Sequence, residues 1–292
     1  MPQHKLTYAF LGPAGTFSDM AVRALVERGS LSADYDSLPC DSLPEVFEAV
    51  ERGKADYGVV PIENSLEGSV TAVLDAFAFT SRAEILGEIA IDIHQALLLN
   101  PDATLDEVTT IASHTQGIGQ CRRWINQNLP NRQLRLADST AAAAEMAAAD
   151  KSVAAIASPL AAEICGISVY EEAIEDNLSS QTRFVIIGKG PVAHDGPGKS
   201  TLALFMNADR PGTLQMILSE LFFAGVNLTM VQSRPTKQEL GDYMFFMDID
   251  GYADEPNIQV ALNCLRMKMR DIRVAYKNAV YLAACKRGYT TC

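Results

Sequence analysis

The feature that most constrains the fold of this chain is a repeated unit of a short apolar β-prone run, a polar turn and an amphipathic helix. Such runs occupy 5–11, 109–113, 134–137 and 153–157, and a helical pattern follows each of them. Ser or Thr stands near most of the helix starts, where its side-chain oxygen can accept a backbone N–H. Repeated units of this kind predict an α/β fold built on open sheets.

The first unit places a glycine-containing turn, 12–15, before a helix. We expect Ser18 to cap this helix and Gly29 to end it. The free N–H groups at such a helix start suit a carboxylate, although a tight structural turn explains the same spacing. The turn is not a P-loop, because the Lys-Ser/Thr ending is missing.

Two further β-prone stretches lie in the first hundred residues. The run at 56–62 predicts a strand, with Glu63, Asn64 and Ser65 at its carboxyl end and a helix that begins near Ser69. The run at 85–99 is strongly β-like and predicts one long strand that crosses between two lobes. We expect Glu67 to be a helix-start cap.

The pattern changes after Gly188, where 189–199 has the Gly, Pro and Asp content of a linker. Six elements follow in the order βαββαβ, which is the ferredoxin-like pattern. We expect them at 201–206, 213–224, 227–233, 243–249, 256–270 and 272–276. The predicted division is a first domain at 1–188, the linker, a second domain at 200–277 and a tail at 278–292.

Composition excludes several classes of protein. The net charge of −12 argues against a nucleic-acid partner. The six Cys and four His form no CxxC or HExxH motif, so no metal site is predicted and the thiols are expected to be reduced in a cytoplasmic protein. No signal peptide is visible, and no apolar run approaches the roughly 20 residues that span a bilayer.

A polar run, 176–181, gives way at Thr182-Arg183-Phe184 to an apolar strand pattern that ends at Gly188. With three other motifs, this triplet resembles the prephenate dehydratase family. Those motifs are Gly12-Pro13-Ala14-Gly15-Thr16-Phe17-Ser18, the stretch from Val60 to Val70 that includes Glu63-Asn64-Ser65, and Ser113-His114-Thr115-Gln116. The region from residue 210 to 235 resembles the ACT regulatory domain, so the resemblance spans nearly the whole chain.

The resemblance implies a catalytic domain of two lobes, similar to a periplasmic binding protein, and the conversion of prephenate to phenylpyruvate. Water and carbon dioxide leave in this reaction, and no cofactor is required. Thr182 would assist the departing hydroxyl, and Arg183 would offer a two-pronged donor to a carboxylate. The other implied substrate-binding residues are Thr16, Ser18, Glu63, Asn64, Ser65, Ser113, Gln116, Ser139, Thr140 and Phe184, of which Phe184 is expected mainly to pack.

Two positions depart from the family pattern. Ser180 stands where the family usually has asparagine, and Thr115 where the motif commonly has proline. Both lie in expected pocket loops. Neither change removes the proposed acid.

The ACT resemblance implies that L-phenylalanine binds as an effector between two copies, so a homodimer or homotetramer is expected. The implied effector-binding residues are Pro211, Gly212, Thr213, Leu214, Asn227, Leu228, Thr229, Gln232, Ser233, Arg234 and Pro235. Gln232 stands where the family usually has glutamate. A domain that only dimerises the enzyme is therefore the alternative.

Other functions remain open on the sequence. An arogenate dehydratase performs the same chemistry on the aminated substrate, and an amino-acid sensor would use the same architecture without catalysis. A prephenate decarboxylase that keeps the hydroxyl is disfavoured by the presence of Thr182. No chorismate mutase segment precedes Lys5, so we expect the monofunctional form.

Overall fold

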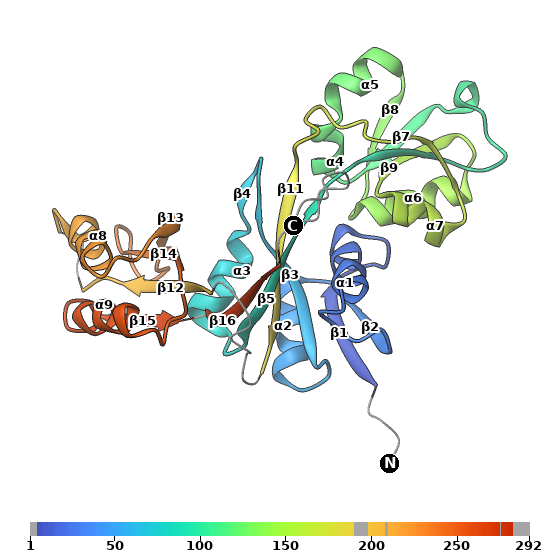
Figure 1. Ribbon diagram of the computed structural model, residues 1–292. Helices are drawn as coiled ribbons and strands as arrows, with labels where there is room; N and C mark the ends of the chain where they lie inside the picture. The colour runs from blue at the N-terminus through green and yellow to red at the C-terminus, as the bar shows by residue number, and fades with distance from the viewer. Residues whose placement is uncertain (1–4, 190–197, 208–209, 275, 283–292) are drawn as a thin grey trace, which may run out of the picture. The chain divides into compact units, whose positions relative to one another are not determined.

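The computed structural model describes residues 5–189, 198–207, 210–274 and 276–282. The chain forms two compact units. The first unit comprises Met1–Val46, Val59–Val70 and Ala90–Phe184, and the second comprises Phe47–Gly58, Thr71–Ile89 and Val185–Cys292. Figure 1 shows the elements, which are mixed α/β as predicted.

A five-stranded sheet of order β10-β6-β9-β7-β8 lies within the first unit. Its strands are β6 (Ala96–Leu99), β7 (Thr110–Ser113), β8 (Gln133–Leu136), β9 (Val153–Ala157) and β10 (Ser168–Glu171). Strand β7 runs parallel to β8 and β9, whereas β6 runs antiparallel to β9 and β10. The helices that follow these strands are α4 (Thr115–Gln120), α5 (Arg122–Asn128), α6 (Thr140–Ala149) and α7 (Pro159–Cys165).

Side chains of this sheet alternate between two apolar clusters. Ala96 and Leu98 of β6 pack with the alanines of α6 and α7, whereas Leu97 and Leu99 pack with residues of α4–α5 such as Ile125. This alternation follows from the period of two in a β-strand. The small side chains of α6 let that helix lie close to the sheet, and both faces are covered.

The largest sheet has the order β16-β5-β11-β3-β1-β2, with β4 paired to β3. Its strands are β1 (Leu6–Leu11), β2 (Tyr35–Cys40), β3 (Tyr57–Asn64), β4 (Gly68–Ser69), β5 (Glu84–Asp92), β11 (Gln181–Gly188) and β16 (Tyr276–Leu282). The helices in the same stretch of chain are α1 (Phe17–Glu27), α2 (Leu43–Glu51) and α3 (Thr71–Asp75), and α3 continues into a π-helical turn, η1 (Ala76–Thr80). The end of β3 and the start of β11 carry the motifs singled out above.

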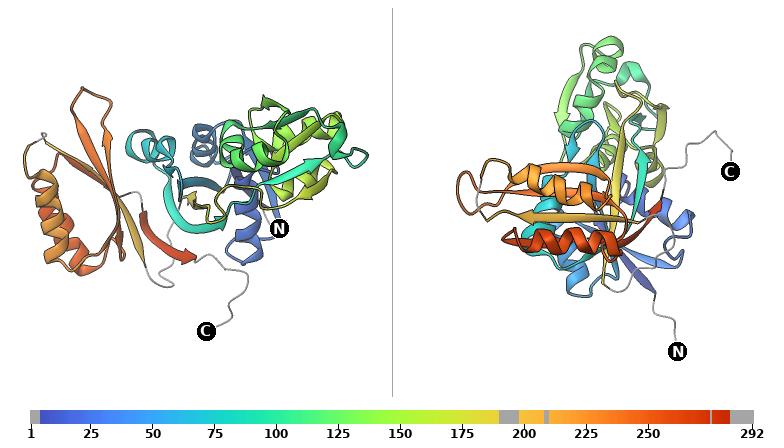
Figure 2. Two further views of the ribbon diagram at one scale, coloured as in Figure 1. Left: turned by 90° about the horizontal axis from the view of Figure 1, so that it is seen from above. Right: turned by 60° about the vertical axis from the view of Figure 1, so that its left-hand side comes forward.

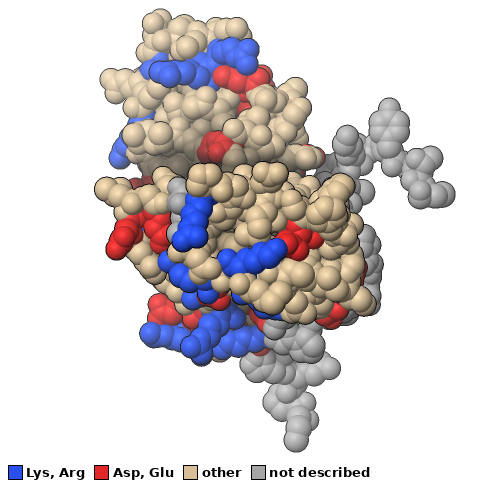
Figure 3. All heavy atoms as spheres, turned by 90° about the vertical axis from the view of Figure 1, so that its left-hand side faces the viewer, with Lys and Arg blue, Asp and Glu red and all other residues tan. Residues whose placement is uncertain are grey.

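The C-terminal elements follow the predicted βαββαβ order. They are β12 (Lys199–Phe205), α8 (Thr213–Phe223), β13 (Leu228–Pro235), β14 (Tyr243–Asp250), α9 (Pro256–Arg266) and β15 (Asp271–Val274). The antiparallel sheet has the order β13-β14-β12-β15, and Figure 2 shows α8 and α9 together on one of its faces. Leu202 and Leu204 pack there against Ile217 and Leu262. Figure 3 shows that acidic and basic side chains lie beside one another on the side that it views.

Three expectations about elements were wrong. Thr16 caps α1 instead of Ser18, because its Oγ1 accepts the N–H of Asp19 at 3.4 Å. The long strand expected at 85–99 is two strands, β5 and β6, because the N–H of Gln95 turns to the carboxylate of Glu175 at 2.8 Å. Glu67 caps no helix, since α3 begins only at Thr71.

Two further expectations concern the regions that flank the C-terminal elements. Strand β16 pairs parallel with β5 and occupies 276–282, part of the stretch expected to be a tail. Most of the expected linker, 190–197, lies outside the described residues, as does 283–292.

Candidate active site

The Asn64 side chain connects the end of β3 to the start of β11. Its Nδ2 donates to Oγ1 of Thr182 at 2.9 Å and lies 3.5 Å from Oγ of Ser180. Its Oδ1 accepts the N–H groups of Leu66 at 2.9 Å and Glu67 at 3.1 Å. One buried carboxamide therefore fixes both a turn and a threonine hydroxyl.

This arrangement determines which hydrogen bond the Thr182 hydroxyl accepts and which one it can still donate. A hydroxyl has one O–H donor and two acceptor lone pairs, and the Asn64 N–H occupies a lone pair. The O–H hydrogen of Thr182 remains able to donate to another group. As a proton leaves this oxygen, the Asn64 N–H stabilises the charge that develops on it.

Ser65 holds the same two strand ends together. Its N–H donates to the carbonyl of Gln181 at 2.8 Å, and its Oγ accepts the N–H of Gln181 at 3.0 Å. The Ser65 hydroxyl donates to the carbonyl of Ser179 at 3.3 Å. Ser65 thus fixes the entrance to β11, where Thr182 lies.

Arg183 and Glu63 form an ion pair, with 3.2 Å between Nη2 and Oε2. The arginine side chain is 14% exposed and the glutamate 39%. Successive side chains of a strand point to opposite faces, so this pair projects away from the face that carries Thr182 and Asn64. The structure therefore brings Thr182 together with Asn64, and Arg183 together with Glu63.

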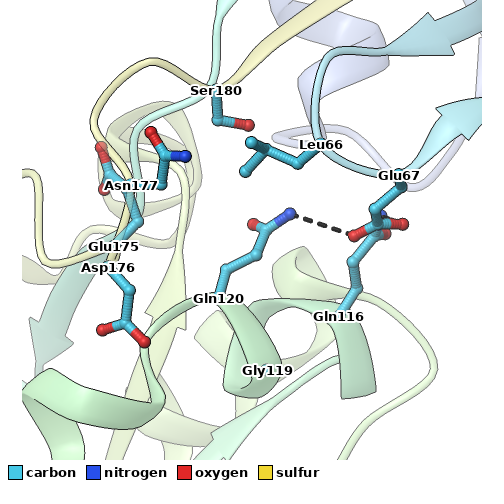
Figure 4. Close-up of a pocket in the computed structure, with 9 residues that line it drawn as sticks. All are labelled: Leu66, Glu67, Gln116, Gly119, Gln120, Glu175, Asp176, Asn177 and Ser180. Carbon is cyan, nitrogen blue, oxygen red and sulfur yellow. Dashed lines mark hydrogen bonds between the residues drawn. The ribbon is translucent and has the colours of Figure 1, made fainter.

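A cavity of about 330 Å³ lies next to this network. It is lined by Leu66, Glu67, Gln116, Gly119, Gln120, Glu175, Asp176, Asn177 and Ser180, which Figure 4 shows. Ser180 belongs both to this lining and to the surroundings of the Asn64 amide. The volume falls in the range of small-molecule sites.

The lining is acidic. It includes the carboxylates of Glu67, Glu175 and Asp176, and no Lys or Arg among the described residues lines it. Glu175 is held by Nδ1 of His94 at 2.6 Å and by the backbone N–H of Gln95. Asp176 is also paired with a cation, because Nε of Arg123 lies 3.6 Å from its Oδ2, and this ion pair offsets part of the negative charge of the lining.

Asp176 and Glu67 are tied to helices of the same unit. Asp176 accepts the N–H of Arg123 at 3.1 Å and of Trp124 at 3.3 Å, at the start of α5. Glu67 accepts from the side-chain amides of Gln116 and Gln120 in α4. The cavity walls therefore come from three separate stretches of chain.

The expected anion site at the start of α1 is occupied by internal contacts. Thr16 Oγ1 donates to the carbonyl of Leu11 at 2.9 Å, and Ser18 is only 5% exposed. Gly15 has a φ of +86° and lies against α7, where Ser158 donates to the Gly15 carbonyl at 2.6 Å. The glycine motif thus packs on α7 through Ser158, a residue that the sequence did not single out.

The remaining expected substrate-binding residues also have structural partners. Ser113 is fully buried and donates to the carbonyl of Ile156 at 2.6 Å. Ser139 caps α6, as expected, by accepting the N–H of Ala142 at 2.9 Å, and Thr140 begins that helix. Phe184 is buried in the core.

Reasoning from the sequence missed several residues of the cavity. They are Leu66, Gly119, Gln120, Glu175, Asp176 and Asn177. A signal existed for Gln120, which lies four residues after Gln116 and so shares its helix face. Nothing local indicated Glu175 or Asp176, because their partners lie about 50 to 80 residues away in the chain.

The expected effector-binding residues lie on α8, β13 and the turns before them. Gly212 has a φ of +88° at the start of α8, and Asn227 donates to Asp250 at 2.7 Å. Oε1 of Gln232 is buried and has no hydrogen-bond partner among the residues that the structure describes. Arg234 is paired within its own unit, because its Nη2 donates to Oδ1 of Asp75 at 2.7 Å. The other members are Pro211, Thr213, Leu214, Leu228, Thr229, Ser233 and Pro235.

The described part of the chain has neither a metal-binding cluster nor a membrane-spanning helix. No group of three or more His, Cys, Asp or Glu side chains there is arranged to hold a metal ion. Among the same residues, no helix is both long and apolar enough to cross a membrane.

Comparisons with known proteins found prephenate dehydratases and also one protein described as an acylase. The sequence model of a family described as prephenate dehydratase matches residues 8–192. A prephenate dehydratase of Amycolatopsis methanolica is 36% identical over 267 residues, which cover 91% of this chain and 86% of that protein. The structure is similar to that of an Arthrobacter aurescens prephenate dehydratase in complex with L-Phe, with a TM-score of 0.84, 35% identity and coverage of 94% and 90%. It is also similar to GqqA, described as a quorum quenching acylase, with a TM-score of 0.81, 28% identity and coverage of 94% and 98%.

Proposed function

The chain belongs to the prephenate dehydratase family, and we infer from this membership that it converts prephenate to phenylpyruvate. The C–O bond to the ring hydroxyl and the C–C bond to the ring carboxylate break. The electron pair of the C–C bond completes the aromatic ring. The hydroxide takes up a proton and leaves as water, and the carboxylate leaves as carbon dioxide.

We propose that Thr182 supplies the proton to the departing hydroxyl. The observation that carries this role is the 2.9 Å bond from Asn64, which leaves the threonine O–H as a donor and stabilises its oxygen as the proton moves. Water and a threonine hydroxyl are acids of similar weakness, so transfer is in concert with C–O cleavage. Solvent water then returns a proton to Thr182.

The expected role of Arg183, to hold a substrate carboxylate beside Thr182, does not fit its position, because its side chain projects from the opposite face of β11 and pairs with Glu63. We propose instead that the ion pair of Arg183 and Glu63 holds β11 and the end of β3 together next to the Thr182–Asn64 pair.

The C-terminal elements supply the proposed regulation. We propose that 200–277 is an ACT domain that binds L-phenylalanine, joined through a linker at 189–199 to a catalytic domain at 1–188. The observed βαββαβ order and the L-Phe complex of the Arthrobacter aurescens relative support this proposal. We also propose that the protein is a homodimer or homotetramer in the cytoplasm.

Arogenate dehydratase is the second candidate function, and the acidic cavity favours it. Arogenate carries an ammonium group where prephenate carries a keto group. Glu67, Glu175 and Asp176 would attract that ammonium. The chemistry at Thr182 is the same for both substrates.

The test is a steady-state assay with prephenate and with arogenate, in which phenylpyruvate and phenylalanine are measured separately. Thr182→Ala should lower kcat by about two to four powers of ten, the scale of a lost proton donor. Thr182→Ser keeps the hydroxyl and should retain most of the activity. Wild-type turnover by Thr182→Ala would rule out Thr182 as the donor, and no product from either substrate would rule out both functions.

A further inference from the structure

The side chain of Glu67 joins two walls of the cavity. Its Oε2 accepts from Nε2 of Gln116, and its Oε1 accepts from Nε2 of Gln120 at 3.3 Å. Gln116 and Gln120 are four residues apart on α4 and so share one helix face. Glu67 itself lies in the turn between β3 and β4, and Figure 4 shows its carboxylate directed at both amides.

The backbone of the same residue is tied to the proposed proton donor. The N–H of Glu67 donates to Oδ1 of Asn64 at 3.1 Å, and Nδ2 of Asn64 donates to Thr182. Helix α4 is therefore connected to the Thr182 hydroxyl through the two residues Glu67 and Asn64. Each link in this connection is a hydrogen bond between side chains or from backbone to side chain, and all of them lie within one unit.

Helix α4 depends on such anchors. It is six residues long, and helices of that length are not stable by themselves in water. Its start is capped by His114, and Gln120 is also held by Nε2 of Gln95 at 3.1 Å. Glu67 accepts from both glutamines that face the cavity from this helix, so its loss removes the side-chain link between α4 and the turn after β3.

We propose that Glu67 is a positioning residue of the dehydratase, whose carboxylate holds α4 in register with the Asn64–Thr182 pair. This inference rests on the proposed function. Glu67 need not contact the reacting atoms. Its carboxylate sets the shape of the cavity that receives the substrate, and loss of the anchor should weaken substrate binding more than it slows the chemical step.

The test exchanges the hydrogen-bond donor, Gln116, and the acceptor, Glu67. Glu67→Ala removes the acceptor, and Gln116→Glu sets two carboxylates against each other. Each should raise KM on the order of tenfold, the scale of one charge-assisted hydrogen bond, while kcat changes less than about threefold. The double variant Glu67→Gln with Gln116→Glu restores an amide–carboxylate pair of reversed direction. Its KM should return to within about threefold of the wild-type value.

Glu107→Gln is the matched control. Glu107 is also exposed and accepts from neutral donors, the N–H and hydroxyl of Thr104, but lies outside the cavity lining. Its KM should match the wild type. The proposal would be overturned if Glu67→Ala had the wild-type KM, or if the double variant Glu67→Gln with Gln116→Glu did not recover a KM near the wild-type value.

A second readout does not depend on turnover. Backbone amides of α4 and its end, such as those of Ile118 and Cys121, are bonded within the helix and should exchange with deuterium faster in Glu67→Ala. The exchanged pair should restore their protection. Unchanged exchange in Glu67→Ala would overturn the anchoring role, whether or not the wild type is active. A wild type that released no product would contradict only the proposed function.

Discussion

The carboxamide of Asn64 illustrates how one side chain serves structure and chemistry together. Its oxygen accepts two backbone N–H groups of a turn, and its nitrogen donates to a hydroxyl. A carboxylate of the same shape can do only the first, since it has no N–H to donate. The two functions can therefore be separated by a substitution of nearly equal volume.

Asn64→Asp should abolish most activity while it preserves the fold. The carboxylate would accept the Thr182 O–H, so this proton could no longer be donated to the substrate. We expect kcat to fall by about two to three powers of ten, with a melting temperature close to that of the wild type. Steady-state kinetics and circular dichroism melting measure the two effects.

The control for this change is Asn100→Asp. Asn100 likewise accepts a backbone N–H, that of Asp102, and donates to a backbone carbonyl, that of Ala148, but it lies outside the cavity lining. Its kcat should be unaffected. If Asn64→Asp turned over substrate at the wild-type rate with its fold intact, Asn64 would have no part in proton donation.

At the scale of elements, a partly buried carboxylate, that of Asp75, connects the short helix α3 to the strand β13 within the second unit. Asp75 ends α3, where the π-helical turn η1 begins. Its two oxygens lie 2.7 Å from the nitrogens of Arg234 and Lys237. Burial alone raises the pKa of Asp75, but the hydrogen bonds and charges of both cations outweigh it and hold the pKa below its usual value.

Asp75→Asn should destabilise the protein in a pH-dependent way. Because the folded pKa of Asp75 is lowered, its contribution is present above the ordinary pKa of about 4 and is lost as the pH falls through the folded value. At pH 7 we expect a loss on the order of 1 kcal/mol in the free energy of unfolding, discounted for partial exposure. Denaturant unfolding at pH 7 and at acidic pH should show the difference shrink.

Glu220→Gln provides the comparison, since Glu220 pairs with Lys268 in the same unit but both side chains are more exposed than Asp75 and Arg234. It should destabilise the protein less than Asp75→Asn does. An Asp75→Asn effect that stayed constant down to acidic pH would show that the ion pair is not its source.

At the scale of the whole molecule, the proposed phenylalanine regulation depends on the C-terminal elements. Asn227 lies in the turn before β13, and its side chain is held by Asp250. Arg234 of the same strand is already engaged by Asp75. An effector that binds near β13 must favour one conformation over another by about 1–3 kcal/mol to regulate activity.

Asn227→Ala should weaken phenylalanine binding about tenfold, as expected for a lost polar contact. Calorimetric titration of phenylalanine into both proteins, beside activity curves, measures this. Asn257→Ala is the control, because Asn257 donates to the Ala224 carbonyl elsewhere in the same region. Equal affinity in Asn227→Ala would move the site elsewhere, and no binding by the wild type would leave a domain that only dimerises the enzyme.

The sequence by itself determined the succession of elements in most of the chain. Val153–Ala157 is a strand with the predicted bounds, and the βαββαβ order of the C-terminal region was correct. These features depend on local signals: apolar periodicity, Ser or Thr at helix starts and glycine at turns. The motif around Asn64 and Thr182 was also found, because both residues lie at ends of predicted strands.

Only the tertiary structure decided which polar groups face a cavity and which face the backbone. Ser113 and Thr16 look like ligands in the sequence, yet each hydroxyl is taken by a carbonyl of its own fold. Glu67 looked like a cap, yet its carboxylate meets the glutamines of a helix about 50 residues away. The physical reason is that the sequence shows which polar groups require a hydrogen-bond partner, whereas the packing of distant segments determines which partner each group has.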